Sequence, residues 1–375
     1  MKDQAPVAND AASAQEDGLA YCCWWRSAAK FEECARLKSE LVPQSLSKLT
    51  PTLKLLREME RLALVAPAGL DELRHKLFTY RSGDFWVPTG GIGKEAMDIP
   101  AVSTILLAGF HDAGKSSLVN LMYSVFGRSG LIPFPQATCG SGFDPKSWFM
   151  EEHNVLRSMR SGFCVYDTRG FDYDRVYQCT EELSEWLSEG VRHKQPCFQP
   201  GEHESEMASF PSKFARRRVT CVMVVANVSD IHKALKVGDK QPLEATKELF
   251  CSPPLKRCNE NPILILTHGD KLSTEERIDS RLKICQHLGV SETSGVYDIV
   301  CLTEFGFLAD ESDPITAYAL CEAIYRALLI SDRSHLPKKN FQDWAFHCLS
   351  WLVCLLGVFF SLLGHIFSKL GQKIH

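Results

Sequence analysis

The chain has 375 residues, of which 45% are hydrophobic and 23% are charged, and its formal net charge is −4. This length permits a full hydrophobic core and predicts one α/β domain with added segments, while the weak net charge gives no indication of nucleic-acid binding. Fifteen cysteines occur without C-x-x-C pairs, which indicates free thiols in a reducing, cytosolic environment.

The first 100 residues are expected to precede the main domain. Residues 1–26 are predicted to be disordered, because the start of the chain is rich in Ala, Asp, Gln and Ser and lacks the layout of a secretory signal. Residues 27–100 are predicted to form a helical extension and a linker rich in Gly and Pro. Its helices are expected at Ser27–Leu41, Pro51–Leu64 and Leu70–Tyr80, where apolar residues recur at three- and four-residue steps.

The main domain is predicted over residues 101–332, where apolar β-prone runs alternate with helical patterns. Strands are expected at Thr104–Ala108, Phe163–Tyr166, Val219–Ala226, Ile263–Thr267 and Val296–Leu302. Helices are expected at Lys115–Phe126, Arg175–Glu189, Pro242–Phe250, Thr274–Leu288 and Pro314–Ile330. This alternation predicts an α/β fold with a mainly parallel sheet. Residues 192–218 are too long for an ordinary connection and are expected to form an insertion loop.

A glycine-containing loop stands between the first strand and the first helix of this domain. Gly109–Ser116 matches G-x-x-x-x-G-K-[ST], a pattern whose backbone N–H groups curl around phosphate oxygens at a helix N-terminus. Lys115 would add a positive charge, and Ser116 would offer a hydroxyl to Mg²⁺. The expected phosphate-binding residues are Gly109, Asp112, Ala113, Gly114, Lys115, Ser116 and Ser117.

A second segment places an acid where it can reach a metal ion beside that loop. Asp167-Thr168-Arg169-Gly170 is a D-x-x-G sequence at the end of a predicted strand. Asp167 is expected to hold Mg²⁺, and the Gly170 N–H to sense a γ-phosphate. Thr138, in the loop after the first helix, is expected to complete the Mg²⁺ shell, although an ordinary loop threonine is the alternative.

The third segment, Thr267-His268-Gly269-Asp270, ends another strand. Across residues 102–330 the three segments resemble the G1, G3 and G4 motifs of P-loop GTPases, with His268 in place of the family's lysine. The resemblance implies a P-loop NTPase three-layer sandwich that binds GTP or GDP with Mg²⁺. It implies that Asp270 accepts hydrogen bonds from guanine, beside Thr267 and His268. The loop helix and the T-H-G-D sequence are similar to interferon-induced and immunity-associated GTPase relatives.

The resemblance also bears on hydrolysis. It implies catalytic roles for Lys115, Thr138 and Gly170, but Phe171 stands where Ras-like members have a glutamine that orients water. Slow hydrolysis is therefore expected, and a second copy of the chain or an activating partner would complete the catalytic site. Arg169 is a further candidate for a positive charge near the γ-phosphate. Two alternatives stay open: a nucleotide-binding membrane scaffold without useful turnover, and an ATPase.

The C-terminal region predicts a membrane anchor. Residues 344–367 contain no Asp, Glu, Lys or Arg, and as a helix they would extend about 36 Å against roughly 30 Å of hydrocarbon. A transmembrane helix is expected there, after a linker at 333–343 and before a short tail at 368–375. The protein would then be single-pass and tail-anchored, with its nucleotide-binding domain in the cytosol. Polar residues such as His347 and His365 support the alternative of a buried or interfacial helix.

Overall fold

The computed structural model describes residues 22–39, 49–88, 93–127, 149–158, 160–197, 214–258, 262–301, 313–338 and 341–371. The chain divides into two compact units. The first comprises Met1–Val87 with Pro100–Ser334, and the second comprises Pro88–Ile99 with His335–His375.

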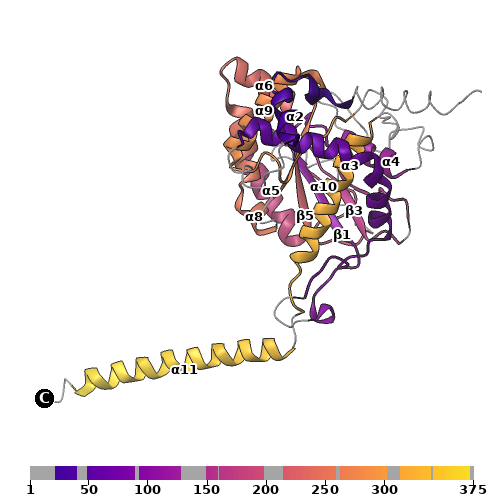
Figure 1. The fold of residues 1–375 in the computed structure, drawn as a ribbon. Coiled ribbons are helices and arrows are strands. Elements are labelled where there is room, and N and C mark those ends of the chain that lie inside the picture. Colours follow the sequence, from indigo (N-terminus) through magenta and orange to yellow (C-terminus); the bar gives the residue numbers. More distant parts are fainter. Residues whose placement is uncertain are drawn as a thin grey trace, which may run out of the picture. The chain divides into compact units, whose positions relative to one another are not determined.

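The first unit contains a mixed, mostly parallel sheet (Figure 1). In the described residues its strands are β1 (Ser103–Gly109), β2 (Phe149–His153), β3 (Phe163–Asp167), β4 (Gln195–Pro196), β5 (Cys221–Asn227), β6 (Ile263–Thr267) and β7 (Val296–Asp298). Their order across the sheet is β4-β2-β3-β1-β5-β6-β7. Strands β3, β1, β5, β6 and β7, which are neighbours in this order, run parallel to one another. Strand β2 is antiparallel to both β3 and β4. The predicted α/β class and mainly parallel sheet are confirmed. The antiparallel pairing of β2 at one edge of the sheet was not predicted.

The helices of the first unit in the described residues are α2 (Phe31–Ser39), α3 (Pro51–Thr79), α4 (Lys115–Phe126), α5 (Val176–Glu189), α6 (Val228–Lys236), α7 (Gln241–Phe250), α8 (Pro253–Cys258), α9 (Thr274–Leu288) and α10 (Pro314–Arg333). Short 3₁₀ turns are η1 (Trp24–Ser27), η5 (Tyr173–Arg175) and η6 (Gly269–Lys271). The helices at α4, α5, α7, α9 and α10 match expected ones, while α6 and α8 were not expected.

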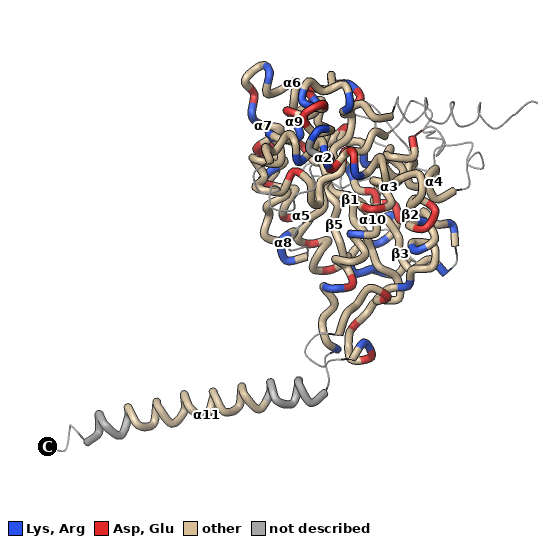
Figure 2. The backbone as a smooth tube through the Cα atoms, in the orientation of Figure 1, with Lys and Arg blue, Asp and Glu red and all other residues tan. Residues whose placement is uncertain are grey.

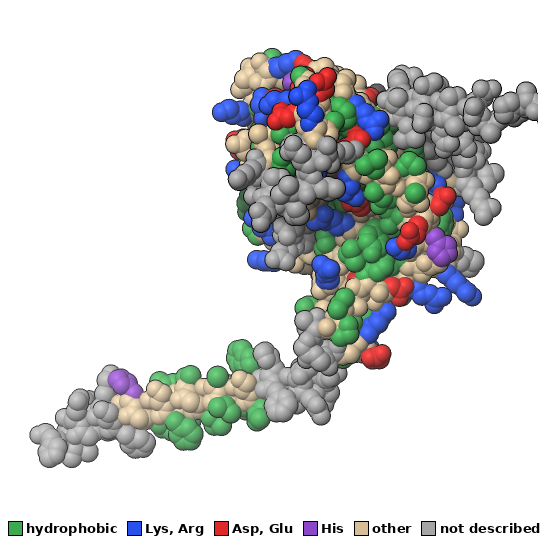
Figure 3. All heavy atoms as spheres, viewed as in Figure 1, with side chains coloured by type: hydrophobic (Ala, Val, Ile, Leu, Met, Phe, Trp, Pro, Cys, Tyr) green, Lys and Arg blue, Asp and Glu red, His purple; other side chains and the backbone are tan. Residues whose placement is uncertain are grey.

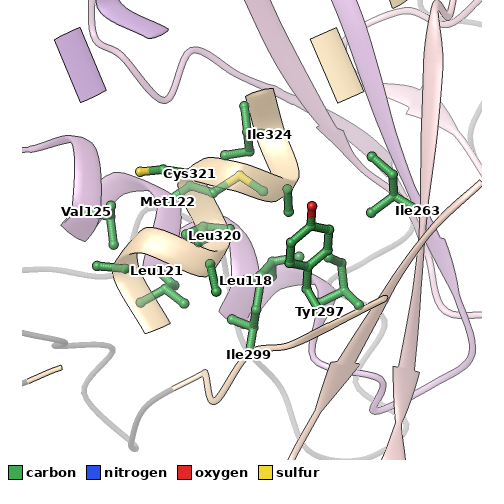
Figure 4. Close-up of a cluster of buried hydrophobic side chains, with 14 of the residues drawn as sticks. Leu118, Leu121, Met122, Val125, Ile263, Tyr297, Ile299, Leu320, Cys321 and Ile324 are labelled. Atoms are coloured by element: carbon green, nitrogen blue, oxygen red, sulfur yellow. The ribbon is translucent and has the colours of Figure 1, made fainter. Parts of the chain in front are cut away.

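Hydrophobic cores cover both faces of the sheet. Along β1, Ile105 and Leu107 join one buried cluster and Leu106 and Ala108 join the other, as the two-residue period of a strand requires. Helices α3, α4 and α10 supply the first cluster, and α5, α6 and α7 supply the second. Figure 4 shows part of the first cluster, with Leu118 of α4 gathered near side chains of α10.

The N-terminal region corrects two expectations. The predicted helices at Pro51–Leu64 and Leu70–Tyr80 are one helix, α3, which continues through Pro67. Its buried apolar residues follow one helical face and share the core with the sheet, so burial outweighs the helix-breaking effect of proline. Helix α3 is therefore part of the main domain and not a separate extension.

The predicted disordered segment 1–26 is also too long. Trp25 is only 1% exposed, and its indole Nε1 donates a hydrogen bond to Glu60 Oε2 of α3 at 3.2 Å. Burial of a large aromatic ring explains why this part of the chain is ordered. Residues 1–21 lie outside the described part.

In the second unit, residues from the two predicted linkers pair with each other. Met97 forms an antiparallel bridge with Pro337, the Asp98 N–H donates to Leu336 O at 2.8 Å, and the Lys338 N–H donates to Ala96 O at 2.7 Å. The short turn η3 (Lys94–Ala96) precedes this bridge.

The second unit also contains α11 (Phe341–Gly371), within which the predicted span 344–367 falls. Its described side chains run from 349 to 365 and include no charged residue, as Figure 2 shows. Large apolar side chains along it are exposed, including Trp351, Phe359 and Phe360, and they form the green surface of this helix in Figure 3. Among the described residues, no helix reaches both the length and the hydropathy that a membrane span needs.

Candidate functional site

The three sequence segments singled out above meet at one edge of the sheet. Gly109–Ser116, here called the glycine loop, follows β1, Asp167–Gly170 begins at the end of β3, and Thr267–Asp270 begins at the end of β6. The strands are parallel, so their carboxyl ends lie together. The chain passes from β1 to β3 on one side and then to β5 on the other. Ligands of open α/β sheets bind at such a reversal of strand order.

The glycine loop approaches its neighbours closely. A methyl group on Gly109 would overlap the carbonyl oxygen of Val225 on β5, so only glycine fits there. Gly114 has φ +85° and immediately precedes α4, while Asp112 also has a positive φ of 54°. The loop therefore ends at the N-terminus of a 12-residue helix, where backbone N–H groups and the helix dipole favour an anion.

Lys115 is buried within this loop. Its Nζ donates hydrogen bonds to Gly109 O at 3.1 Å and to Phe110 O at 3.0 Å, and no described carboxylate forms an ion pair with it. Burial lowers the pKa of Lys115 to about 8, against the opposing charges of Asp167 and Asp112. A buried cation of this kind is costly to the fold, and an anionic ligand in the loop would offset that cost.

Ser116 and Asp167 join the glycine loop to β3. The Ser116 hydroxyl donates to Asp167 Oδ2 at 2.5 Å, while Oδ1 is buried and no described residue donates to it. Burial raises the pKa of Asp167, against the charge of Lys115. A hydroxyl and an unpaired carboxylate oxygen fit Mg²⁺, which takes few protein ligands and completes its shell with water and phosphate. Among the described residues there is no cluster of three or more His, Cys, Asp or Glu that could hold a metal.

The segment after Asp167 lies directly against the glycine loop. The Phe171 N–H donates to Gly109 O at 3.1 Å, and the His111 N–H donates to Phe171 O at 2.9 Å. A methyl group on Gly170 would lie 2.7 Å from His111 Cα, so this contact requires glycine. His111 Nε2 also lies 3.1 Å from Asp172 Oδ1. The structure thus brings Gly170 to the loop, as expected.

Phe171 and Arg169 have surroundings that the sequence did not predict. The Phe171 ring is 3% exposed and stacks on Trp186 of α5 with a centroid distance of 5.9 Å. Phe171 is therefore a core residue as well as the residue after the D-x-x-G sequence. The Arg169 guanidinium donates through Nη1 to Cys197 O at 3.4 Å.

The Thr267–Asp270 segment is tied to the glycine loop by a side chain. Thr267 Oγ1 donates to Ala113 O at 2.7 Å and lies 3.0 Å from His268 Nδ1. His268 has φ 58°, and burial lowers the pKa of its imidazole. Asp270 is exposed in η6, and no described residue donates a hydrogen bond to its carboxylate. Its oxygens are thus available to an incoming ligand.

Two contributors were missed by sequence reasoning. Asn227 ends β5, and its Nδ2 donates to Asp112 O at 3.2 Å, so a fourth strand end supports the loop. A polar residue closing an apolar strand was the available signal. Arg277 of α9 forms a bidentate pair with Asp298 of β7, with both N–O distances at 2.7 Å. No local pattern in the sequence marks that pair.

Some expected site features lie wholly or partly outside the described residues. Thr138 lies outside the described residues. The expected insertion loop at 192–218 is described at its two ends, where β4 begins at Gln195 and Arg217 pairs with Val191. Its central part, 198–213, lies outside the described residues.

Comparison with the models of known protein families finds no match for this chain, and comparison with curated proteins finds no matching sequence.

Proposed function

We propose that the chain is a membrane-anchored guanine-nucleotide-binding protein of the P-loop GTPase class, which hydrolyses GTP slowly and acts as a nucleotide-dependent switch. The observation that carries the proposal is the contact between Ser116 and Asp167 beside buried Lys115. These two residues belong to different sequence motifs 51 positions apart, and phosphate and magnesium binding requires them together.

Each part of the site has a role in this proposal. The backbone N–H groups of the glycine loop and the Lys115 ammonium bind the phosphates, because they are the positive groups at the start of α4. Ser116 and Asp167 would hold Mg²⁺, which when bound neutralises charge on the phosphate oxygens. Asp270 accepts hydrogen bonds from the ring N–H and amine of guanine, a donor pair that adenine lacks.

The position of Gly170 supports a switch. Its backbone lies against His111, so a γ-phosphate in the glycine loop would meet this contact directly. A ligand with that phosphate and a ligand without it would then favour different positions of the D-x-x-G segment.

Helix α11 supports the membrane part of the proposal. A run of exposed apolar side chains, within a stretch (349–365) that has no charged residue, is unfavourable in water and favourable in hydrocarbon. We infer a single C-terminal anchor over residues 344–367 with the nucleotide-binding unit in the cytosol.

A scaffold that binds nucleotide without useful turnover is the second candidate. The burial of Phe171 favours it, because this side chain packs on Trp186 and cannot orient a water molecule. Turnover measurements separate the two candidates.

The test uses the full chain purified in detergent micelles, with Lys115→Ala as the matched variant. GTP and ATP turnover are measured with Mg²⁺ at several protein concentrations. The switch proposal predicts GTP turnover that is lost in Lys115→Ala, and a rate per molecule that rises with concentration indicates completion of the site by a second copy. Binding of GTP without turnover supports the scaffold, and tighter binding of ATP than GTP contradicts the assignment to guanine.

A further inference from the structure

The N-terminal turn, defined as Cys22–Ala29, docks beside the Thr267–Asp270 segment. Trp24 O accepts a hydrogen bond from Thr274 Oγ1 at 3.2 Å, and the Ser27 and Thr274 hydroxyls lie 2.8 Å apart. The Ala29 N–H donates to Glu275 Oε1 at 2.8 Å. Both partner residues belong to the first turn of α9, which starts four positions after Asp270. Two regions far apart in sequence therefore meet next to the proposed guanine-binding residues.

The Trp24 ring covers a buried ion pair under that segment. Arg277 Cζ lies 3.9 Å from the centroid of the Trp24 ring, a cation–π distance. The Arg277 and Asp298 side chains are 7% and 1% exposed, and their two hydrogen bonds are charge-assisted. Trp24 thus packs directly against the guanidinium of this buried pair.

Arg277 in turn supports the backbone that carries Asp270. A methyl group on Gly269 would overlap the Arg277 guanidinium, so the guanidinium lies directly against this peptide. Gly269 stands between His268 and Asp270. Any movement of Arg277 toward solvent would therefore remove the support under the base-binding residues.

The N-terminal turn is itself held in place. Arg26 forms a bidentate pair with Glu60 of α3, with distances of 3.1 and 3.0 Å, and Trp25 donates to the same carboxylate. The turn is thereby attached to α3 through its middle residues, Trp25 and Arg26, and to α9 on both sides of them. This double attachment makes the position of Trp24 well defined.

We propose that Trp24 is a positioning residue that determines guanine specificity, acting through Arg277 and the Gly269 peptide on the carboxylate of Asp270. This inference rests on the proposed function, since it assumes that a guanine nucleotide binds. Two hydrogen bonds from guanine to Asp270 are sensitive to the direction of its carboxylate, whereas the phosphate end of the site is formed by other elements.

The test compares three ligands on the full chain in detergent micelles with Mg²⁺: GDP, IDP and inorganic pyrophosphate. The base of IDP lacks the exocyclic amine of guanine, and pyrophosphate has no base. We expect Trp24→Ala to weaken GDP binding about tenfold, the size of a lost hydrogen bond to a charged group. We expect a smaller loss for IDP and none for pyrophosphate, so that the GDP-to-IDP preference falls. Trp24→Phe, which keeps an aromatic face over Arg277, should restore most of the preference.

The matched control is Trp86→Ala, another partly buried tryptophan, which should leave all three affinities unchanged. An unchanged GDP-to-IDP preference in Trp24→Ala would overturn the inference, and so would a parallel loss of pyrophosphate binding. Failure of the wild-type chain to bind any of the nucleotides would instead refute the proposed function, and the inference with it.

A second measurement needs no variant. Amide hydrogen exchange of the wild-type chain is followed with GDP and with pyrophosphate. GDP should slow exchange both at residues 268–272 and in the N-terminal turn, while pyrophosphate should slow it only in the glycine loop. Bound GDP that protects 268–272 and leaves the N-terminal turn unchanged would contradict the coupling.

Discussion

Replacing Thr267 by valine should loosen the glycine loop with little change in side-chain shape. The Thr267 hydroxyl is buried and donates to Ala113 O at 2.7 Å, which ties the end of β6 to the loop that precedes α4. Valine puts a methyl group in place of this hydroxyl. The carbonyl oxygen of Ala113 then loses its hydrogen-bond donor. The methyl carbon of valine lies as close to this oxygen as the donor oxygen did.

The structure sets the size of the effect. A buried hydrogen bond contributes about 1 kcal/mol, and an acceptor left without its donor raises the loss to about 1–3 kcal/mol. Crowding of the methyl group against the carbonyl adds to this, so Thr267→Val should lower the free energy of unfolding by about 2–3 kcal/mol. Thr267→Ser keeps the hydroxyl and removes one methyl group, at a cost of about 1 kcal/mol.

Two assays on the full chain in detergent micelles measure this difference. Urea denaturation without ligand gives the free energy of unfolding of each variant, and displacement of a fluorescent GDP analogue gives its dissociation rate. We expect faster GDP dissociation, by about tenfold, from Thr267→Val and a nearly unchanged rate from Thr267→Ser. Equal stability and equal GDP dissociation rates in the two variants would refute the role given to the hydrogen bond between Thr267 and Ala113.

Three further predictions follow from buried groups. Burial lowers the pKa of His153 to about 4, so the ligand-free chain should lose up to about 3 kcal/mol of stability as the pH falls from 6.5 toward 4. Urea denaturation at several pH values should show a clearly larger loss in the wild type than in His153→Gln. Phe171→Gln should destabilise the chain by about 2–4 kcal/mol and bring no gain in GTP turnover, because the side chain belongs to the core; faster turnover would contradict this. Removal of Mg²⁺ with EDTA should speed GDP release from the wild type, and Asp167→Asn should make release insensitive to EDTA. A full EDTA response in Asp167→Asn would rule out its role as a metal ligand.

Local sequence patterns were sufficient to predict the start of the site. Gly114 and Lys115 mark the boundary between loop and helix, and α4 begins at Lys115 as expected. Strands β1 and β6 are buried along their whole length and contain the apolar runs Ile105–Ala108 and Ile263–Leu266, so their positions were also predictable. Asp167 ends β3 and Asp270 lies three residues after the end of β6, so the D-x-x-G and T-H-G-D sequences stand beside strand ends as the sequence predicts.

The sequence did not predict features that depend on distant partners. Strand β2 is a short, partly exposed strand with two adjacent glutamates, and it forms because β3 offers an edge for pairing. Helix α3 continues past Pro67 because its apolar face is buried in the common core. The contacts of Trp24 with Arg277 and of Arg277 with Asp298 join residues that no periodicity relates.

The identity of the nucleotide bound by the protein tests the central claim most directly. The full chain is purified in detergent with Mg²⁺, washed and denatured, and the released small molecules are separated by ion-exchange chromatography and quantified against protein. The wild type should release close to one GDP or GTP per chain, and Lys115→Ala should release almost none. Release of adenine nucleotides would contradict the assignment to guanine. If the chain also stays empty after incubation with excess GDP and GTP, the proposal that it binds guanine nucleotides is wrong.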